Sequence, residues 1–158
     1  MQCIADTNIL IDLDNGGLLE EALSRVGEWY VPDLILAEIN TIEPARLRYL
    51  GLQVRHLTAS QLIRITELAA RHRAPSIRDL AALLLALDEG MLLLTGDNAL
   101  RKLAQSLGIE VHGVLWVLDQ LYDDGFSPRR LEKGLKQILS AGAYLPQEEV
   151  IRRFNTWL

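Results

Sequence analysis

Short apolar runs that alternate with longer amphipathic stretches constrain the fold of this chain most strongly. Residues 2–5 and 91–95 have the unbroken apolar character of strands that are buried on both faces. Residues 28–31, 52–57 and 109–112 are expected to be three further short strands. Because helical stretches separate these runs, the sequence predicts an α/β fold in which helices cover both faces of a central parallel sheet.

The helical stretches are marked by their end signals. Thr58 and Gln61 have the spacing of a capping box, which predicts a helix from there to Arg73. Pro75 ends that helix, and Gly90 closes the next one. The other helices are expected over residues 8–26 with a break at 15–17, 33–39 capped by Asp33, 76–89, 98–107 capped by Asp97, 114–122, 128–139 and 146–157.

The size and composition fit one compact domain, which we expect to span residues 1–158. A hydrophobic fraction of 49% is sufficient for a well-formed core. Cys3 is the only cysteine, so no disulfide can form within the chain, as is usual in the reducing cytosol. Since neither a signal peptide nor a membrane-spanning run is evident, we expect a cytoplasmic protein with no membrane partner.

Arginine is concentrated in the middle of the chain. Seven arginines and one glutamate occupy residues 46–78, whereas the whole chain carries a formal charge of −5. Arginine is the side chain best suited to bidentate contacts with phosphate. Two interpretations stay open: this segment contacts nucleic acid, or it forms the solvated face of its helices.

Four acidic residues define a candidate site. Asp6 and Asp97 come directly after apolar strand-like runs, while Glu38 and Asp79 lie in predicted helices. Ligands of open α/β sheets bind beyond the carboxyl ends of the strands, and carboxylates that gather there need a cation to remain ionised. Mg²⁺ or Mn²⁺ suits such oxygen ligands and keeps water for chemistry. The pattern therefore predicts a metal-dependent enzyme that cleaves phosphodiesters.

Roles can be assigned within this hypothesis. Asp6, Asp79 and Asp97 are the expected metal ligands, and Glu38 is expected to bind a second ion or to orient the attacking water. The side chains expected to orient the carboxylates are Asn8 and Thr95. Two cations lie within a turn of an acidic residue and would contact a substrate phosphate or pair with that acid instead, namely Arg78 and Arg101.

Each acidic residue also has an ordinary structural explanation. Asp97 has the position of a helix N-cap, and Asp79 follows Ser76 with the spacing of a capping box. Asp6 could accept hydrogen bonds in a turn between a strand and a helix. Glu38 lies among apolar residues, where a carboxylate without a partner is costly to bury. A capping carboxylate can still offer its second oxygen to a metal, so both interpretations remain compatible.

Taken together, these residues resemble the PIN domain, the nuclease fold of many bacterial and archaeal toxins, including the VapC-like nucleases. The resemblance is carried by Asp-Thr-Asn at residues 6–8, Glu38, Asp79 and Thr-Gly-Asp at residues 95–97. It covers about residues 1–115, the expected core. The C-terminal helices, about residues 116–158, are similar to those of an uncharacterised PIN subfamily predicted to bind nucleic acid.

The resemblance implies a ribonuclease that uses a divalent metal and leaves a 5′-phosphate and a 3′-hydroxyl. It further implies an RNA substrate, a small antitoxin protein as a possible partner, and a homodimer. Two alternatives remain. The fold could serve as a catalytically silent module that binds RNA or protein, or the chain could be a phosphohydrolase with an aspartyl nucleophile. The latter class has a second Asp two residues after the first, where this chain has Asn8.

Overall fold

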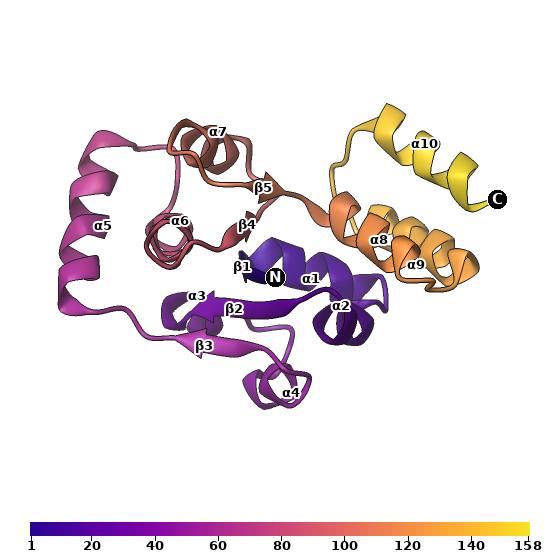
Figure 1. Cartoon of the computed structure of the whole chain (residues 1–158), viewed down its shortest axis with the longest axis horizontal. Helices are drawn as coiled ribbons and strands as arrows, with labels where there is room; N and C mark the ends of the chain where they lie inside the picture. The colour runs from indigo at the N-terminus through magenta and orange to yellow at the C-terminus, as the bar shows by residue number, and fades with distance from the viewer.

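The centre of the molecule is a five-stranded sheet in which all strands are parallel (Figure 1). The computed structural model describes residues 1–158, and the strand order is β3-β2-β1-β4-β5. The strands are β1 (Gln2–Ala5), β2 (Glu28–Pro32), β3 (Gln53–Arg55), β4 (Leu92–Leu94) and β5 (Val111–His112). The predicted α/β architecture is therefore confirmed, with each strand at the expected place in the sequence.

β1 forms the middle of the sheet because both of its neighbours pair with it directly. Ile4 lies opposite Tyr30 of β2 on one side and Leu93 of β4 on the other. Cys3, Ile4 and Ala5 are fully buried, as expected for a strand covered on both faces. The carboxyl ends of β1 and β4 are therefore neighbours, although 89 residues separate them in sequence.

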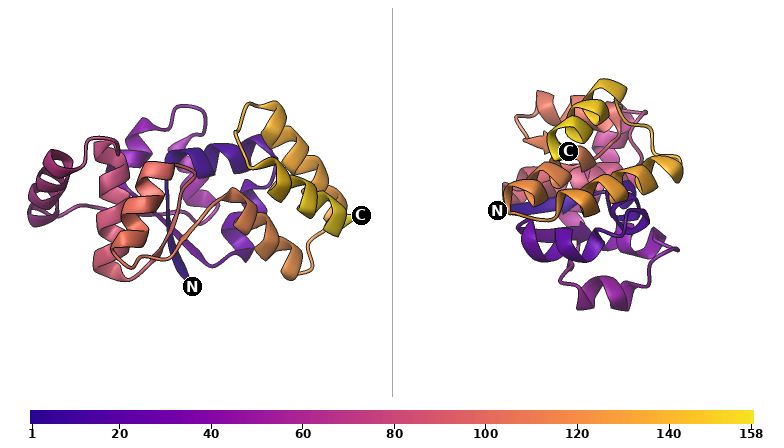
Figure 2. Two further views of the ribbon diagram at one scale, coloured as in Figure 1. Left: turned by 90° about the horizontal axis from the view of Figure 1, so that it is seen from above. Right: turned by 90° about the vertical axis from the view of Figure 1, so that its right-hand side faces the viewer.

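Ten helices surround the sheet and connect its strands. They are α1 (Thr7–Asn15), α2 (Leu19–Arg25), α3 (Asp33–Glu38), α4 (Pro44–Tyr49), α5 (Ala59–Arg71), α6 (Ile77–Glu89), α7 (Asn98–Ser106), α8 (Val114–Asp123), α9 (Pro128–Ser140) and α10 (Gln147–Trp157). The group α5, α6 and α7 lies on one side of β1, whereas α1, α2, α8 and α9 pack together on the other (Figures 1 and 2).

Most predicted helix ends are confirmed, because they depend on local hydrogen bonds. Both side-chain bonds of the capping box at Thr58 form, and Ser76 and Asp79 form a second box at the start of α6. Gly90 ends α6 in the left-handed conformation, with φ of 68°. Three details were wrong. Pro32 belongs to β2, Asp33 is the first residue of α3 instead of its cap, and the short helix α4 was not predicted.

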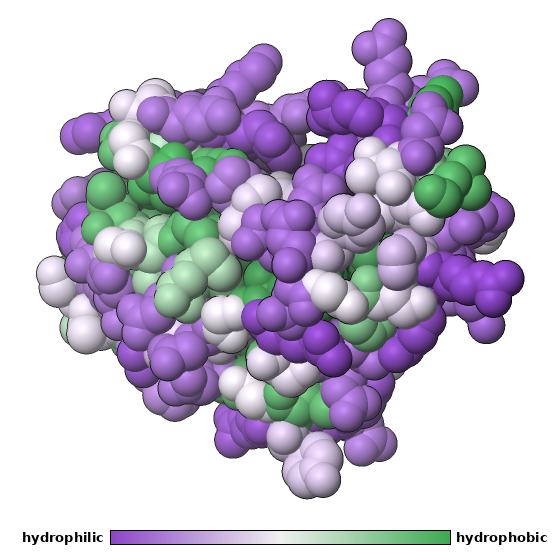
Figure 3. All heavy atoms as spheres, turned by 45° about the vertical axis from the view of Figure 1, so that its right-hand side comes forward, coloured by the Kyte–Doolittle hydropathy of each residue, from purple (hydrophilic) through white to green (hydrophobic).

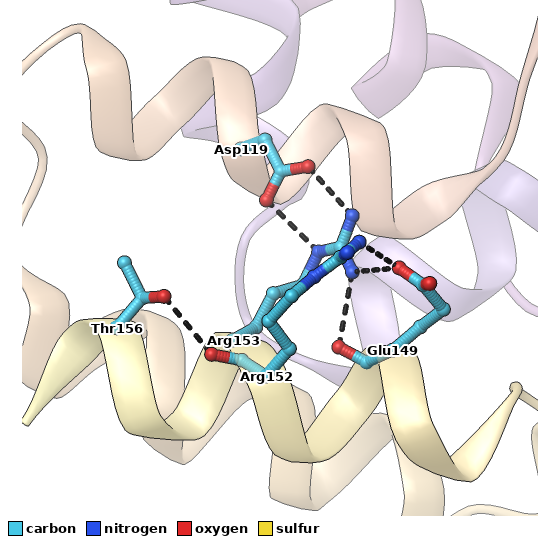
Figure 4. Close-up of polar contacts among 5 residues, drawn as sticks. All are labelled: Asp119, Glu149, Arg152, Arg153 and Thr156. Atoms are coloured by element: carbon cyan, nitrogen blue, oxygen red, sulfur yellow. Dashed lines mark hydrogen bonds and ion pairs between the residues drawn. The ribbon is translucent and has the colours of Figure 1, made fainter.

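The C-terminal helices join the core through close packing and one ion-pair network. α9 crosses the end of α1 so closely that a Cβ added to Gly134 would lie 2.9 Å from the carbonyl oxygen of Gly16. α10 is anchored to α8 by Arg153, whose Nε and Nη2 donate to the two carboxylate oxygens of Asp119 at 2.9 and 2.7 Å (Figure 4). Arg153 also donates to the backbone and side chain of Glu149. No helix is long and apolar enough to cross a membrane.

Candidate active site

Asp6 and Thr95 meet at the carboxyl edge of the sheet, where the strands end. Asp6 follows β1 and Thr95 follows β4, so strand pairing brings both residues to the same place. The Thr95 hydroxyl donates to the Asp6 Oδ2 atom over 2.5 Å. Both side chains are buried, with Asp6 only 5% exposed. These two are the buried polar residues of the chain, and they are bonded to each other.

The Asp6 carboxylate is also the N-cap of α1. Its Oδ1 atom accepts the Ile9 N–H at 3.1 Å, which satisfies one of the free donors in the first turn. Burial raises the pKa of this carboxyl from 3.8 to about 6; the bonds from Thr95 and Ile9 oppose the rise, and the charge of Asp79 adds to it. Asp79 therefore lies near enough for the two carboxylates to repel each other.

Asp97 is joined to Asp6 through Thr95. The Asp97 N–H donates to the Thr95 Oγ1 atom at 3.1 Å, while that same hydroxyl donates its proton to Asp6. Asp97 caps α7, where its Oδ1 atom accepts the Leu100 N–H at 2.8 Å. The Asp97 side chain is exposed, and its second oxygen makes no hydrogen bond. Thr95 thus bridges a buried carboxylate and an exposed one.

Asp79 and Glu38 reach the same region from α6 and α3. Asp79 lies in the first turn of α6, where its Oδ2 atom accepts the Ser76 N–H at 3.0 Å. Glu38 was expected to lie against an apolar helix face, but its side chain is 41% exposed and 3.1 Å from the Nε atom of Arg78. The ion pair supplies the charge partner that the sequence did not reveal.

The remaining predicted residues take different positions. Asn8 is exposed in the first turn of α1. Arg101, one turn into α7, donates from Nη2 to the carbonyl oxygen of Thr95 at 3.3 Å. Its Nε atom is buried without a hydrogen-bond partner. Of the two predicted phosphate contacts, Arg78 therefore faces a carboxylate, and Arg101 faces the backbone of the β4–α7 turn.

The donor set has the chemistry of a divalent-metal site, but its side chains are not drawn together around one point. No three His, Cys, Asp or Glu side chains lie close enough to hold an ion between them. Mg²⁺ keeps several waters and often takes only one or two carboxylates from a protein. Asp6 and Asp79 are carboxylates of this kind, and the charge of Asp79 contributes to the raised pKa of Asp6.

Comparison with known proteins identifies the fold. A family model described as a PIN domain matches residues 2–156. The chain belongs to the PIN domain family. That match ends at residue 156, within α10. Proteins of this family are generally nucleases. None of the curated proteins matches the sequence.

Two solved structures illustrate how the PIN fold is shared. One is a PilT N-terminus domain protein from Sulfolobus solfataricus P2, which has a TM-score of 0.53 and 17% identity over 75% of this chain and 92% of its own. The other is VapBC2 from Rickettsia felis, bound to a DNA fragment from its promoter. It has a TM-score of 0.52 and 16% identity over 72% of this chain and 98% of its own. At this level of identity the likeness shows the fold alone.

Sequence reasoning missed two features of the region. It gave no sign of the burial of Asp12, which lies within α1 and whose pKa is raised by burial to about 6. It also left undetected the contact between Arg101 and Gly113, where a Cβ on the glycine would lie 3.2 Å from the Arg101 Nη2 atom. No local pattern marks either feature, because both depend on which elements pack together.

The arginine-rich segment is partly neutralised in the fold. Four of its seven arginines form ion pairs with acids from other elements: Arg46 with Asp14, Arg55 with Glu89, Arg64 with Asp88, and Arg78 with Glu38. The other three, Arg48, Arg71 and Arg73, are exposed and form no ion pair. These three carry charge that no acidic side chain of the chain pairs with.

Proposed function

We propose that this PIN domain is an endoribonuclease that hydrolyses RNA phosphodiester bonds with a divalent metal ion. The observation that supports this most is the hydrogen-bonded bridge from Asp6 through Thr95 to Asp97, with Asp79 close enough to repel Asp6. A buried carboxylate held beside other carboxylates is unfavourable in the absence of a cation. The arrangement therefore suits a site that gains stability when a divalent ion binds.

Asp6, Asp79 and Asp97 are the residues that would hold Mg²⁺ or Mn²⁺. When bound, such an ion activates water and stabilises the charge that develops on the phosphate. Thr95 keeps the Asp6 carboxylate in one orientation, so one of its remaining lone pairs faces a fixed direction. Because burial raises the Asp6 pKa to about 6, this carboxylate must lose its proton before it can act as a ligand.

Glu38 and Arg78 form the outer part of the proposed site. Their ion pair is largely exposed, so it exchanges readily with other partners in solution. A substrate phosphate could take Arg78 from Glu38, which would leave the glutamate free to orient the attacking water or to bind a second ion. Arg48, Arg71 and Arg73 supply additional positive charge for the RNA backbone.

The decisive experiment compares cleavage of a labelled RNA pool by the wild-type chain and by Asp97→Asn. Reactions contain Mn²⁺, Mg²⁺ or a chelator, and thermal melting checks that the variant is folded. Asn is also a good N-cap, so α7 should remain intact in the variant. Metal-dependent cleavage that disappears in Asp97→Asn supports the proposal. Equal cleavage by both proteins contradicts the assignment of the site.

One alternative retains the fold without catalysis: a PIN domain that binds RNA or protein. Two observations favour it, namely the absence of a group of three metal ligands and the ion pair that occupies Glu38. Binding of the RNA pool without cleavage under any metal, with equal affinity for wild type and Asp97→Asn, would select this reading.

Toxin activity and assembly belong to the same proposal. A small antitoxin is the partner that the family resemblance suggests, and one structural neighbour is VapBC2, bound to a DNA fragment from its promoter. A homodimer and a cytoplasmic location also stay predictions. The last two helices turn large apolar side chains inward, since Leu135, Ile138 and Trp157 are buried. The face of the molecule drawn in Figure 3 carries hydrophobic patches among hydrophilic residues.

A further inference from the structure

Every polar atom of Thr95 has a partner, and the partners come from α7 and its cap, from the cap of α1 and from β5. Its hydroxyl joins Asp6 to Asp97, and its N–H donates to the carbonyl oxygen of His112 at the end of β5. Its own carbonyl oxygen accepts from the Arg101 guanidinium. A strand neighbour therefore holds one side of the Thr95 backbone, and a side chain holds the other. Rotation of the Thr95 backbone would move the hydroxyl away from both carboxylates.

Arg101 is enclosed in a way that does not suit a free phosphate contact. Its backbone N–H is tied to the Asp97 carbonyl within α7, and its Nε atom is covered by protein without an acceptor. An arginine that binds phosphate in its usual bidentate manner offers two adjacent N–H groups, and Nε is commonly one of them. In this chain that edge of the guanidinium is closed, and the Nη2 atom is directed to Thr95.

Gly113 supplies the space in which the guanidinium lies. Its φ of −109° is accessible to any residue, so backbone conformation does not require glycine at this position. A Cβ there would lie 3.2 Å from the Arg101 Nη2 atom and 3.7 Å from the Thr95 carbonyl oxygen. A side chain at residue 113 would therefore compete for the same space as the hydrogen bond between Arg101 and Thr95.

We propose that Arg101 is a positioning residue that holds the Thr95 carbonyl, and through it the hydroxyl that bridges Asp6 and Asp97. Gly113 is the second part of this device, because it leaves room for the guanidinium. The effect that we expect on catalysis rests on the proposed nuclease function, because Asp6 and Asp97 are the proposed metal ligands. The contact between Arg101 and Thr95 itself is independent of that function.

The first test separates positioning from substrate binding. Arg101→Met is compared with Lys102→Met, which removes the same charge from an exposed neighbour on α7. Arg101→Met should lower kcat by about 10–100-fold, the usual effect of losing a group that orients metal ligands, and leave KM for RNA unchanged. Lys102→Met should alter neither constant. If Arg101→Met raises KM and leaves kcat unchanged, the substitution has removed a phosphate contact. That result would overturn the proposal.

The second test does not require activity. The Asp97 N–H donates to the Thr95 hydroxyl, so its hydrogen exchange reports directly on the bridge. Exchange at this amide should accelerate by about tenfold or more in Arg101→Met, while the amides of β2 keep their wild-type protection. Unchanged protection at Asp97 would overturn the positioning role. If the wild type cleaves no RNA, the proposed function fails, and this measurement still decides the role of Arg101.

Gly113→Ala provides an independent perturbation of the same contact. Alone, it should accelerate exchange at Asp97 because the new Cβ displaces the guanidinium. In the Arg101→Met background the same change should have little further effect, since the side chain it displaces is already gone. If the two substitutions accelerate exchange additively, Gly113 and Arg101 act separately. That result would contradict the proposal that Gly113 makes room for the Arg101 guanidinium. Arg101→Lys keeps one donor, so the protection of the Asp97 amide should lie between that of the wild type and that of Arg101→Met. If Arg101→Met does not fold, Arg101→Lys is measured in its place.

Discussion

The carboxyl edge of the sheet and the C-terminal helices both gather acidic side chains, but they treat them differently. Between α8 and α10, the acids Asp119 and Glu149 surround Arg153, and the hydrogen bond from this arginine lowers the pKa of Glu149 (Figure 4). At the sheet edge, Asp6 has no cationic partner, and burial raises its pKa to about 6. The acids beside Arg153 are neutralised by side chains of the protein, whereas Asp6 forms no ion pair.

This difference indicates which cluster is structural and which is available for chemistry. Arg153 is only 14% exposed at its side chain and has all its main partners within the chain. Nothing outside the protein is needed to satisfy it. Asp6 is more buried than either acid near Arg153, yet its neighbours are a hydroxyl, a backbone N–H and another carboxylate. Perturbed carboxylates of this kind mark functional sites more often than neutralised pairs do.

The largest expected effect comes from Asp6→Asn. Asn keeps the N-cap of α1 through its carbonyl oxygen, and its amide group can donate to the Thr95 hydroxyl in place of the present bond, so the fold should persist. The substitution removes the charge that would bind the metal, and we expect RNA cleavage to fall below detection. Cleavage assays and thermal melting on the same preparation check both statements. If Asp6→Asn still cleaves RNA, the Asp6 carboxylate is not needed for chemistry, and the two acidic clusters do not differ in function.

Thr95→Val should have the next largest effect. It keeps the shape of the buried side chain but breaks the bridge between Asp6 and Asp97. Loss of a group that orients metal ligands usually costs about 10–100-fold in metal affinity or activity. Isothermal titration calorimetry with Mn²⁺ measures the metal affinity directly. Thr95→Ser retains the hydroxyl and serves as the matched control, with near wild-type affinity.

The pH dependence of Asp6 follows from the direction of its pKa shift. The folded pKa of about 6 lies above the ordinary value of 3.8, so the contribution of this group to stability is full below pH 3.8 and is lost as the pH rises to about 6. Metal binding has the opposite dependence, because it requires the carboxylate. We expect Mn²⁺ affinity to decline by up to about tenfold per unit below pH 6. An affinity that stays constant from pH 7 to 5 would argue against Asp6 as a ligand.

The smallest effect on activity is expected from Arg153→Met. The change removes the link between α8 and α10 and should lower the free energy of unfolding by about 1–2 kcal/mol, since the network is partly exposed. Cleavage by the folded variant should match wild type at a temperature well below its Tm. Urea unfolding and a cleavage assay make the comparison. A loss of activity comparable to that of Thr95→Val would show that the two clusters are coupled.

Much of the fold could be predicted from sequence because its signals are local. The capping boxes at Thr58 and Ser76 involve residues three positions apart, and their bonds form as expected. Gly90 closes α6 for a similarly local reason. The only local signal of the short helix α4 is Pro44 at its first position, since the helix has no side-chain cap bond and one buried residue, Leu47. Packing, and not periodicity, defines it.

The candidate site divides in the same way. The sequence by itself determined that acidic residues follow β1 and β4, because the apolar runs and their ends are visible in the chain. Only the tertiary structure decided that Thr95 bridges Asp6 and Asp97, that Glu38 pairs with Arg78, and that Arg101 is enclosed beside Gly113. The physical reason is distance along the chain. Asp6 and Thr95 lie 89 residues apart, and only the pairing of parallel strands makes them neighbours.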